Sequence, residues 1–183
     1  MKFARAIPGY NHLWAVRDEK KEADELALLF RQWSNANYLL DFFLANLDDL
    51  QGFFHVKKIS EAIMDTMEDA RSLERLILEF PYTEQLDGLF HPLSLSDNRL
   101  HELTREKARN WNRARHPSWL RIYAIRVEPN VYIITGGAIK LTATMQERAH
   151  TQMELNKLNA CRDFLQQHGV FDKDSFIDYI EEE

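Results

Sequence analysis

The residues best suited to chemistry are cations that interrupt apolar, β-prone sequence in the second half of the chain. Segments 122–127 and 131–134 are rich in β-branched and aromatic residues, and the Glu-Pro-Asn break at 128–130 suits a tight turn between antiparallel strands. A sheet that holds cations among hydrophobic residues usually presents them to an anion, and RNA phosphate is such an anion. The cations set into or next to this predicted hairpin are Arg121, Arg126 and Lys140.

Cleavage of RNA without a metal ion needs a base for the 2′-hydroxyl proton, positive charge on the pentacoordinate phosphorane and an acid for the leaving 5′-oxygen. Arginine and lysine on a rigid sheet supply charge, and histidine or a lysine with a shifted pKa moves protons. Strand alternation places Arg121 and Arg126 on opposite faces, so they share a site only if a bulge intervenes. The local candidates are Arg121, Arg126, Lys140, Arg148, His116 and His150.

A basic run precedes the predicted hairpin. Segment 99–115 is either a strand followed by a flexible arm or a short polar helix, and a solvated charged loop is the alternative without function. Trp111 and Trp119 flank the run, and each either stacks on a base or packs in the core. The cations of the run, which we assign to RNA binding together with Arg126 and Arg148, are Arg105, Lys107, Arg109, Arg113 and Arg115.

Charge is distributed unevenly along the 183 residues. The formal net charge is −6, which argues against a nucleic-acid partner, yet segment 101–155 alone carries 9 basic and 5 acidic side chains. Acidic sequence flanks it on both sides. A basic site with acidic surroundings fits this distribution, and so does a surface of mixed charge that binds nothing.

The composition indicates one ordinary globular domain over residues 1–183, with 45% hydrophobic residues to form its core. No apolar run approaches the ~18 residues that span a bilayer, so we expect a soluble, cytoplasmic protein without membrane contact. The single cysteine, Cys161, lies in a helical pattern and is expected to be a buried, inert thiol. No cysteine or histidine cluster has zinc spacing, and we expect neither a metal nor a cofactor.

The remaining patterns predict the elements around the hairpin. Residues 3–7 and 12–16 predict a first strand or a hairpin of two strands, and periodic apolar residues predict a helical hairpin over 18–80, with its first helix ending at Gln51–Gly52. Thr151 and Glu154 form a predicted capping box for a last helix that Gly169 stops. After this helix the sequence predicts an acidic tail over 168–183 that contains one short turn at 174–180. Gly136–Gly137 predicts a bulge or bend.

This order of elements resembles the RelE/HigB superfamily of toxins, especially its phage-derived HigB-like branch. The resemblance rests on Leu89-Phe90-His91-Pro92-Leu93, a strand near 100–104, the run RIYAIRVEPNVYIITGGAIKLT and the helix after it. It covers residues 86–167 well and the first 85 only by the order of elements. Arg121 matches a functional arginine near the start of a family strand, and Lys140 matches a lysine that follows the next strand.

The resemblance implies an α+β fold: a RelE-like small antiparallel sheet with an enlarged N-terminal helical hairpin and a C-terminal helix. It also implies a toxin of a type II toxin-antitoxin system, an mRNA endonuclease that acts on the ribosome and is neutralised by a small antitoxin protein. Arg121, Lys140 and His150 are the expected catalytic residues. The chain departs from the family in its length, its acidic charge and an apparent insertion at Gln146–Arg148.

Two other functions compete with the nuclease. A RelE-fold interaction protein from a prophage or mobile element would lack catalysis and bind a protein through its helical hairpin. A nucleic-acid-binding regulator without chemistry would show steep salt dependence and no cleavage.

Overall fold

The computed structural model describes residues 1–79, 85–97, 99, 102–111 and 116–182. Within these ranges six strands form one open sheet in the order β1-β2-β6-β5-β4-β3. Neighbouring strands are antiparallel, except that β2 and β6 run parallel. The chain is therefore an α+β protein, and the expectation of a wholly antiparallel sheet was wrong at this one pair.

The elements have the following bounds. The strands are β1 (Lys2–Arg5), β2 (Leu13–Arg17), β3 (His91–Pro92), β4 (Thr104–Ala108), β5 (Leu120–Glu128) and β6 (Val131–Ile139). The helices are α1 (Glu25–Trp33), α2 (Ala36–Ala45), α3 (Leu47–Phe54), α4 (Ile59–Glu79), α5 (Ala149–Gln167) and α6 (Lys173–Glu182), with a short 3-10 turn η2 (Leu86–Gly88). No helix in the described ranges combines the length and apolar character that crossing a membrane requires.

Both predicted strand pairs are confirmed. β1 pairs with β2, and β5 pairs with β6 around a turn in which Asn130 takes the left-handed conformation with φ 65°. The first part of the basic run forms strand β4, which pairs with β5 along its whole length. This strand begins at Thr104, whereas the sequence predicted a strand ending there.

The glycine pair forms the predicted bulge. Gly136 pairs with Tyr123 while Ile134 pairs with Ala124, so β6 holds one extra residue at this point. A Cβ atom on Gly136 would clash with the Glu154 carboxylate, and one on Gly137 would lie 2.5 Å from the Arg121 carbonyl oxygen. Only glycine therefore lets β5 and α5 approach β6 this closely.

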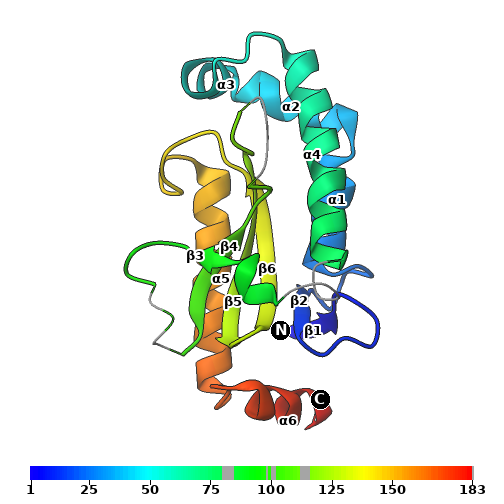
Figure 1. Cartoon of the computed structure of the whole chain (residues 1–183), viewed down its shortest axis with the longest axis vertical. Coiled ribbons are helices and arrows are strands. Elements are labelled where there is room, and N and C mark those ends of the chain that lie inside the picture. Colours follow the sequence, from blue (N-terminus) through cyan, green and yellow to red (C-terminus); the bar gives the residue numbers. More distant parts are fainter. Residues whose placement is uncertain (80–84, 98, 100–101, 112–115, 183) are drawn as a thin grey trace.

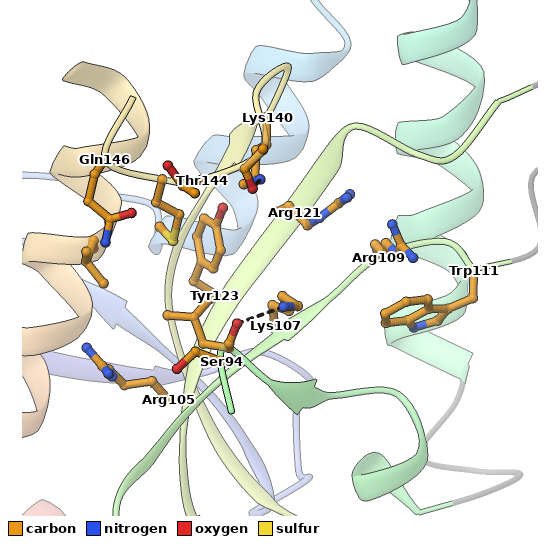
Figure 2. Close-up of a pocket in the computed structure, with 14 residues that line it drawn as sticks. Ser94, Arg105, Lys107, Arg109, Trp111, Arg121, Tyr123, Lys140, Thr144 and Gln146 are labelled. Atoms are coloured by element: carbon orange, nitrogen blue, oxygen red, sulfur yellow. Dashed lines mark hydrogen bonds between the residues drawn. The ribbon is translucent and has the colours of Figure 1, made fainter. Parts of the chain in front are cut away.

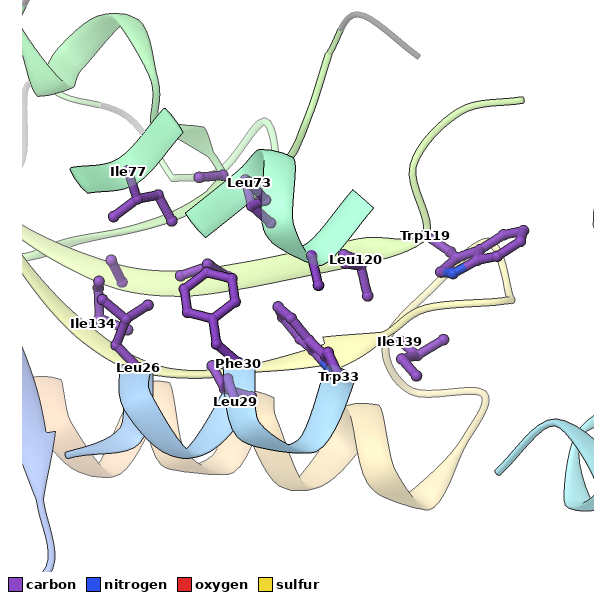
Figure 3. Packing of buried hydrophobic residues seen from close by; sticks show 14 of the residues in the cluster. Leu26, Leu29, Phe30, Trp33, Leu73, Ile77, Trp119, Leu120, Ile134 and Ile139 are labelled. Carbon is purple, nitrogen blue, oxygen red and sulfur yellow. The ribbon is translucent and has the colours of Figure 1, made fainter. Parts of the chain in front are cut away.

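Helices cover both faces of the sheet (Figure 1): α1 and α4 lie together on one side and α5 on the other. Leu26, Phe30 and Trp33 of α1 and Leu73 and Ile77 of α4 belong to one core that packs against β5 and β6 (Figure 3). A second core forms between the opposite face, α5 and α6. Alternate residues of each strand thus enter alternate cores.

The single long helix predicted from residue 18 was wrong. Its residues form α1, α2 and α3, because the Asn35 side chain accepts hydrogen bonds from the N–H groups of Asn37 and Tyr38 (3.0 and 3.2 Å) and starts α2 afresh. Gly52 lies inside α3, which ends at His55 in the left-handed conformation. The second predicted helix is confirmed as α4, and it packs against α1 and α2.

The C-terminal region differs from its prediction in two places. Helix α5 begins at Ala149, so Thr151 is not its cap; the Thr151 hydroxyl instead donates to the Met145 carbonyl oxygen at 2.6 Å. Gly169 ends α5 as predicted, with φ 72°. The expected acidic tail is largely α6, which is longer than the predicted turn because Phe176 is buried against Phe3 and Trp14.

A buried ionic network holds the turn of the β5–β6 hairpin. Asp87 accepts hydrogen bonds from Arg126 (3.1 and 3.2 Å), from the Tyr132 hydroxyl (2.7 Å) and from the Asn130 N–H (3.0 Å). Tyr132 also contacts Glu106, which is fully buried. Burial raises the pKa of Asp87, but the hydrogen bonds from Arg126, Tyr132 and Asn130 outweigh it and lower this pKa to about 2.

Replacing Asp87 by asparagine should lower the free energy of unfolding at pH 7 by about 2 kcal/mol, because the buried Arg126 guanidinium loses its counterion. Urea unfolding measures this, with the exposed Asp41→Asn of α2 as control. Since the pKa of Asp87 is lowered on folding, its contribution is complete above pH 3.8 and disappears as the pH falls through about 2. A difference between wild type and D87N that stays constant from pH 5 to pH 2 would contradict this role.

Candidate functional site

A cavity of about 570 Å³ opens on the α5 side of the sheet. Its strand residues are Arg105 and Lys107 of β4 and Arg121 and Tyr123 of β5, which alternate along their strands so that these side chains share one face. The rest of the lining comes from the segments around the strands: Leu93, Ser94, Arg109, Trp111, Lys140, residues 143–146 and Leu155 (Figure 2). Lys107 pairs with Tyr123 across the β4–β5 ladder, and Arg105 pairs with Ile125.

Five of the described side chains that line this cavity are cations: Arg105, Lys107, Arg109, Arg121 and Lys140. Arg105 is neutralised by Asp97, with 2.8 Å between Nε and Oδ1. The other four form no ion pair with any carboxylate that the structure describes. We call these four residues the cation cluster.

Backbone carbonyl groups hold two members of the cation cluster in place. One Arg121 nitrogen donates to the carbonyl oxygens of Ser118 and Leu120 (2.5 and 2.7 Å). The Lys107 ammonium donates to the Leu93 carbonyl oxygen at 2.8 Å. These contacts orient the head groups without cancelling their charge, so they still attract an anion.

Lys140 stands at the junction of β6 and the segment before α5. Its ammonium donates to the carbonyl oxygens of Thr142 (2.6 Å) and Ala143. Burial, followed by the charges of Arg121 and Lys107, lowers the pKa of Lys140 to about 8. Lys140 therefore loses its proton more readily than an ordinary lysine.

The other cations show the same crowding. Burial and the charge of Arg109 lower the pKa of Arg121 to about 10. Burial and the charge of Arg121 lower the pKa of Lys107. Positive groups that depress one another's pKa in a partly buried cavity are stabilised when an anion binds among them.

Tyr123 adds a neutral hydroxyl to the wall of the cavity. Burial raises its pKa, so the phenol stays protonated, and its oxygen has no hydrogen-bond partner among the described residues. Tyr123 was not predicted to be a site residue. Its position two residues after Arg121 places both side chains on one face of β5, and this spacing could have identified it from the sequence.

The structure separates several other predicted site residues from this cavity. Arg126 lies on the opposite face, bound to Asp87, as alternation predicted. Arg148 pairs with Asp49 at 2.6 Å and does not line the cavity. Arg113 and Arg115 lie outside the described residues.

Neither candidate histidine reaches the cation cluster. His150 lies in the first turn of α5, with Nε2 2.9 Å from the Ile139 carbonyl oxygen and its ring edge-on to Phe42, and it lines a different cavity. His116 stacks on Trp119 at 4.2 Å, with Nε2 3.2 Å from Asp65. Neither histidine is therefore placed to move a proton at the cation cluster.

The two tryptophans of the basic run have different environments. Trp119 is buried in the core and donates its indole N–H to the Thr66 hydroxyl at 2.9 Å. Trp111 is 42% exposed and lines the cavity next to Arg109. Cys161 is buried as expected, and burial raises the pKa of its thiol to about 12.

No group of three or more His, Cys, Asp or Glu side chains within the described ranges is placed to hold a metal ion. Comparison with known protein families, with curated proteins and with solved structures finds no match to this chain.

Proposed function

We propose that the cavity binds the phosphodiester backbone of RNA and cleaves it without a metal ion. The observation that carries this proposal is the convergence of Lys107, Arg109, Arg121 and Lys140 on one cavity, unpaired with any described carboxylate. A phosphodiester supplies the negative charge that this cluster lacks. The cavity volume of about 570 Å³ suits a ligand of the size of a nucleotide.

Lys140 is the proposed general base. In its neutral form two N–H bonds remain directed at the carbonyl oxygens of Thr142 and Ala143, and the lone pair is free to accept the 2′-hydroxyl proton. The 2′-oxygen then attacks phosphorus, and the bond to the 5′-oxygen breaks. The products are a 2′,3′-cyclic phosphate and a 5′-hydroxyl.

Arg121 and Arg109 stabilise the charge that develops on the phosphorane, since guanidinium groups present several donors to phosphate oxygens. Lys107 is the proposed acid for the leaving 5′-oxygen. Its lowered pKa makes it a stronger acid than an ordinary lysine. The Tyr123 hydroxyl is a further donor toward a bound phosphate.

The biological setting follows from the resemblance to the RelE/HigB superfamily. We propose that the chain is a toxin whose substrate is mRNA on the ribosome and whose partner is a small antitoxin protein. Arg121 and Lys140, which carry that resemblance, both line the cavity.

Arg121→Ala and Lys140→Ala should each reduce cleavage of single-stranded RNA in EDTA about 100-fold or more, because they remove charge stabilisation and the base. Exposed Arg75→Ala of α4 and Lys20→Ala are matched controls and should cleave normally. Since the base must be deprotonated, kcat/KM for wild type should rise with pH and level off above about 8. Cleavage that survives both cavity variants, or that shows no ascending limb below pH 8, would refute this assignment of roles.

Expression of the chain alone should slow bacterial growth, and Arg121→Ala should restore it while Arg75→Ala should not. Growth curves with matched protein levels measure this effect. Unimpaired growth with the wild-type chain, despite RNA cleavage in vitro, would reject the toxin setting and leave the nuclease intact.

A non-catalytic interaction protein is the second candidate. It is favoured by exposed apolar side chains in the helical layer, with Leu40 (41%) and Leu44 (56%) one turn apart on α2 and Met64 (70%) on α4. This function predicts no RNA cleavage by any variant.

A further inference from the structure

Trp111 differs from the other tryptophans of the chain in its access to solvent. Trp14, Trp33 and Trp119 are at most 2% exposed, whereas Trp111 is 42% exposed. An exposed indole ring offers a large aromatic surface on which a ligand can stack. No core packing accounts for Trp111, which belongs to neither hydrophobic cluster of the described residues.

Two side chains contact the ring of Trp111. The Arg109 guanidinium lies 3.9 Å from the centroid of the indole ring, and the His91 ring stands perpendicular to it at 4.7 Å. Burial, followed by the charge of Arg99, lowers the pKa of His91. Figure 2 shows Trp111 beyond Arg109, on the side of the cavity away from Arg105 and Gln146.

We propose that Trp111 is the stacking platform for a nucleobase next to the cleaved phosphate. This inference rests on the proposed function and adds the side chain that holds the base, which requires the RNA to be unpaired there. A base in a duplex is stacked on its neighbours and paired on its edge, so it is not available to a side chain. A base that stacks on indole gains affinity without sequence preference, because every base has a π-face.

Arg109 contacts Trp111 and also lines the cavity in which cleavage is proposed. Arg109 both covers the indole ring and lines the cavity with Arg121 and Lys140, so a base on or beside Trp111 places its phosphate at the cation cluster.

Fluorescence gives a direct test, because acrylamide reaches Trp111 while the other three tryptophans are buried. The probes are a 2′-O-methyl RNA hexamer, which cannot be cleaved, the same hexamer in a duplex, and a hexamer of abasic sugar-phosphate units. The single strand should quench Trp111 emission and protect it from acrylamide. The abasic strand and the duplex should bind about 5- to 100-fold more weakly and leave the emission unchanged.

Variants separate stacking from a role in positioning Arg109. Trp111→Leu keeps an apolar contact for the guanidinium but has no ring, and Trp111→Phe keeps a ring. Trp111→Leu should raise KM for single-stranded RNA about 5- to 100-fold with a smaller change in kcat, and Trp111→Phe should recover most of the loss. A loss of kcat in both variants would mean that Trp111 only positions Arg109.

Equal affinity for the hexamer, its abasic counterpart and the duplex would overturn the platform, as would unchanged cleavage by Trp111→Leu, and the nuclease would stand in both cases. Failure of every probe to bind would instead overturn the proposed function together with this inference.

Discussion

The proposed function depends on positive charge that is gathered in one cavity and is not neutralised there by any described carboxylate. Burial, followed by the neighbouring positive charges, lowers the pKa of Lys107, Arg121 and Lys140, and carbonyl oxygens rather than carboxylates hold these three head groups in position. Such an arrangement raises the energy of the empty cavity, and a bound phosphate lowers it. Burial, followed by the charges of Arg121 and Lys107, also lowers the pKa of Lys140 to about 8. One electrostatic environment therefore underlies both the phosphate binding and the proton transfer that we propose.

The sheet makes this concentration of charge possible. The bulge at Gly136 lets β5, β6 and α5 approach closely, and this brings Arg121 on β5 and Lys140 at the end of β6 to the same cavity. On the opposite face Arg126 is fully paired with Asp87. Two arginines five residues apart on one strand therefore have opposite roles, which the alternation of the strand determines. One stabilises the hairpin turn, and the other faces the cavity without a carboxylate partner.

Local patterns predicted much of this arrangement. The two strand pairs, the Gly136–Gly137 bulge and the opposite faces of Arg121 and Arg126 follow from residue types and a period of two. The break at Asn35 was missed because the apolar period of a helix continues across it, and only the side-chain cap reveals the interruption. The capping role of Thr151 was wrong because Thr151 bonds to Met145 instead. The placement of Lys107 beside Tyr123 depends on β4 lying next to β5, and such long-range pairing is not visible in local sequence.

The salt dependence of RNA affinity tests the central claim most directly. The affinity of an uncleavable 2′-O-methyl hexamer, measured over a series of salt concentrations for wild type and Arg121→Ala, reports how many cations of the cavity neutralise phosphates. We predict a steep decrease of log affinity with log salt concentration for wild type, and a slope reduced by about 0.7 in the variant. Affinity that does not depend on salt, or the same slope in both proteins, would contradict the account.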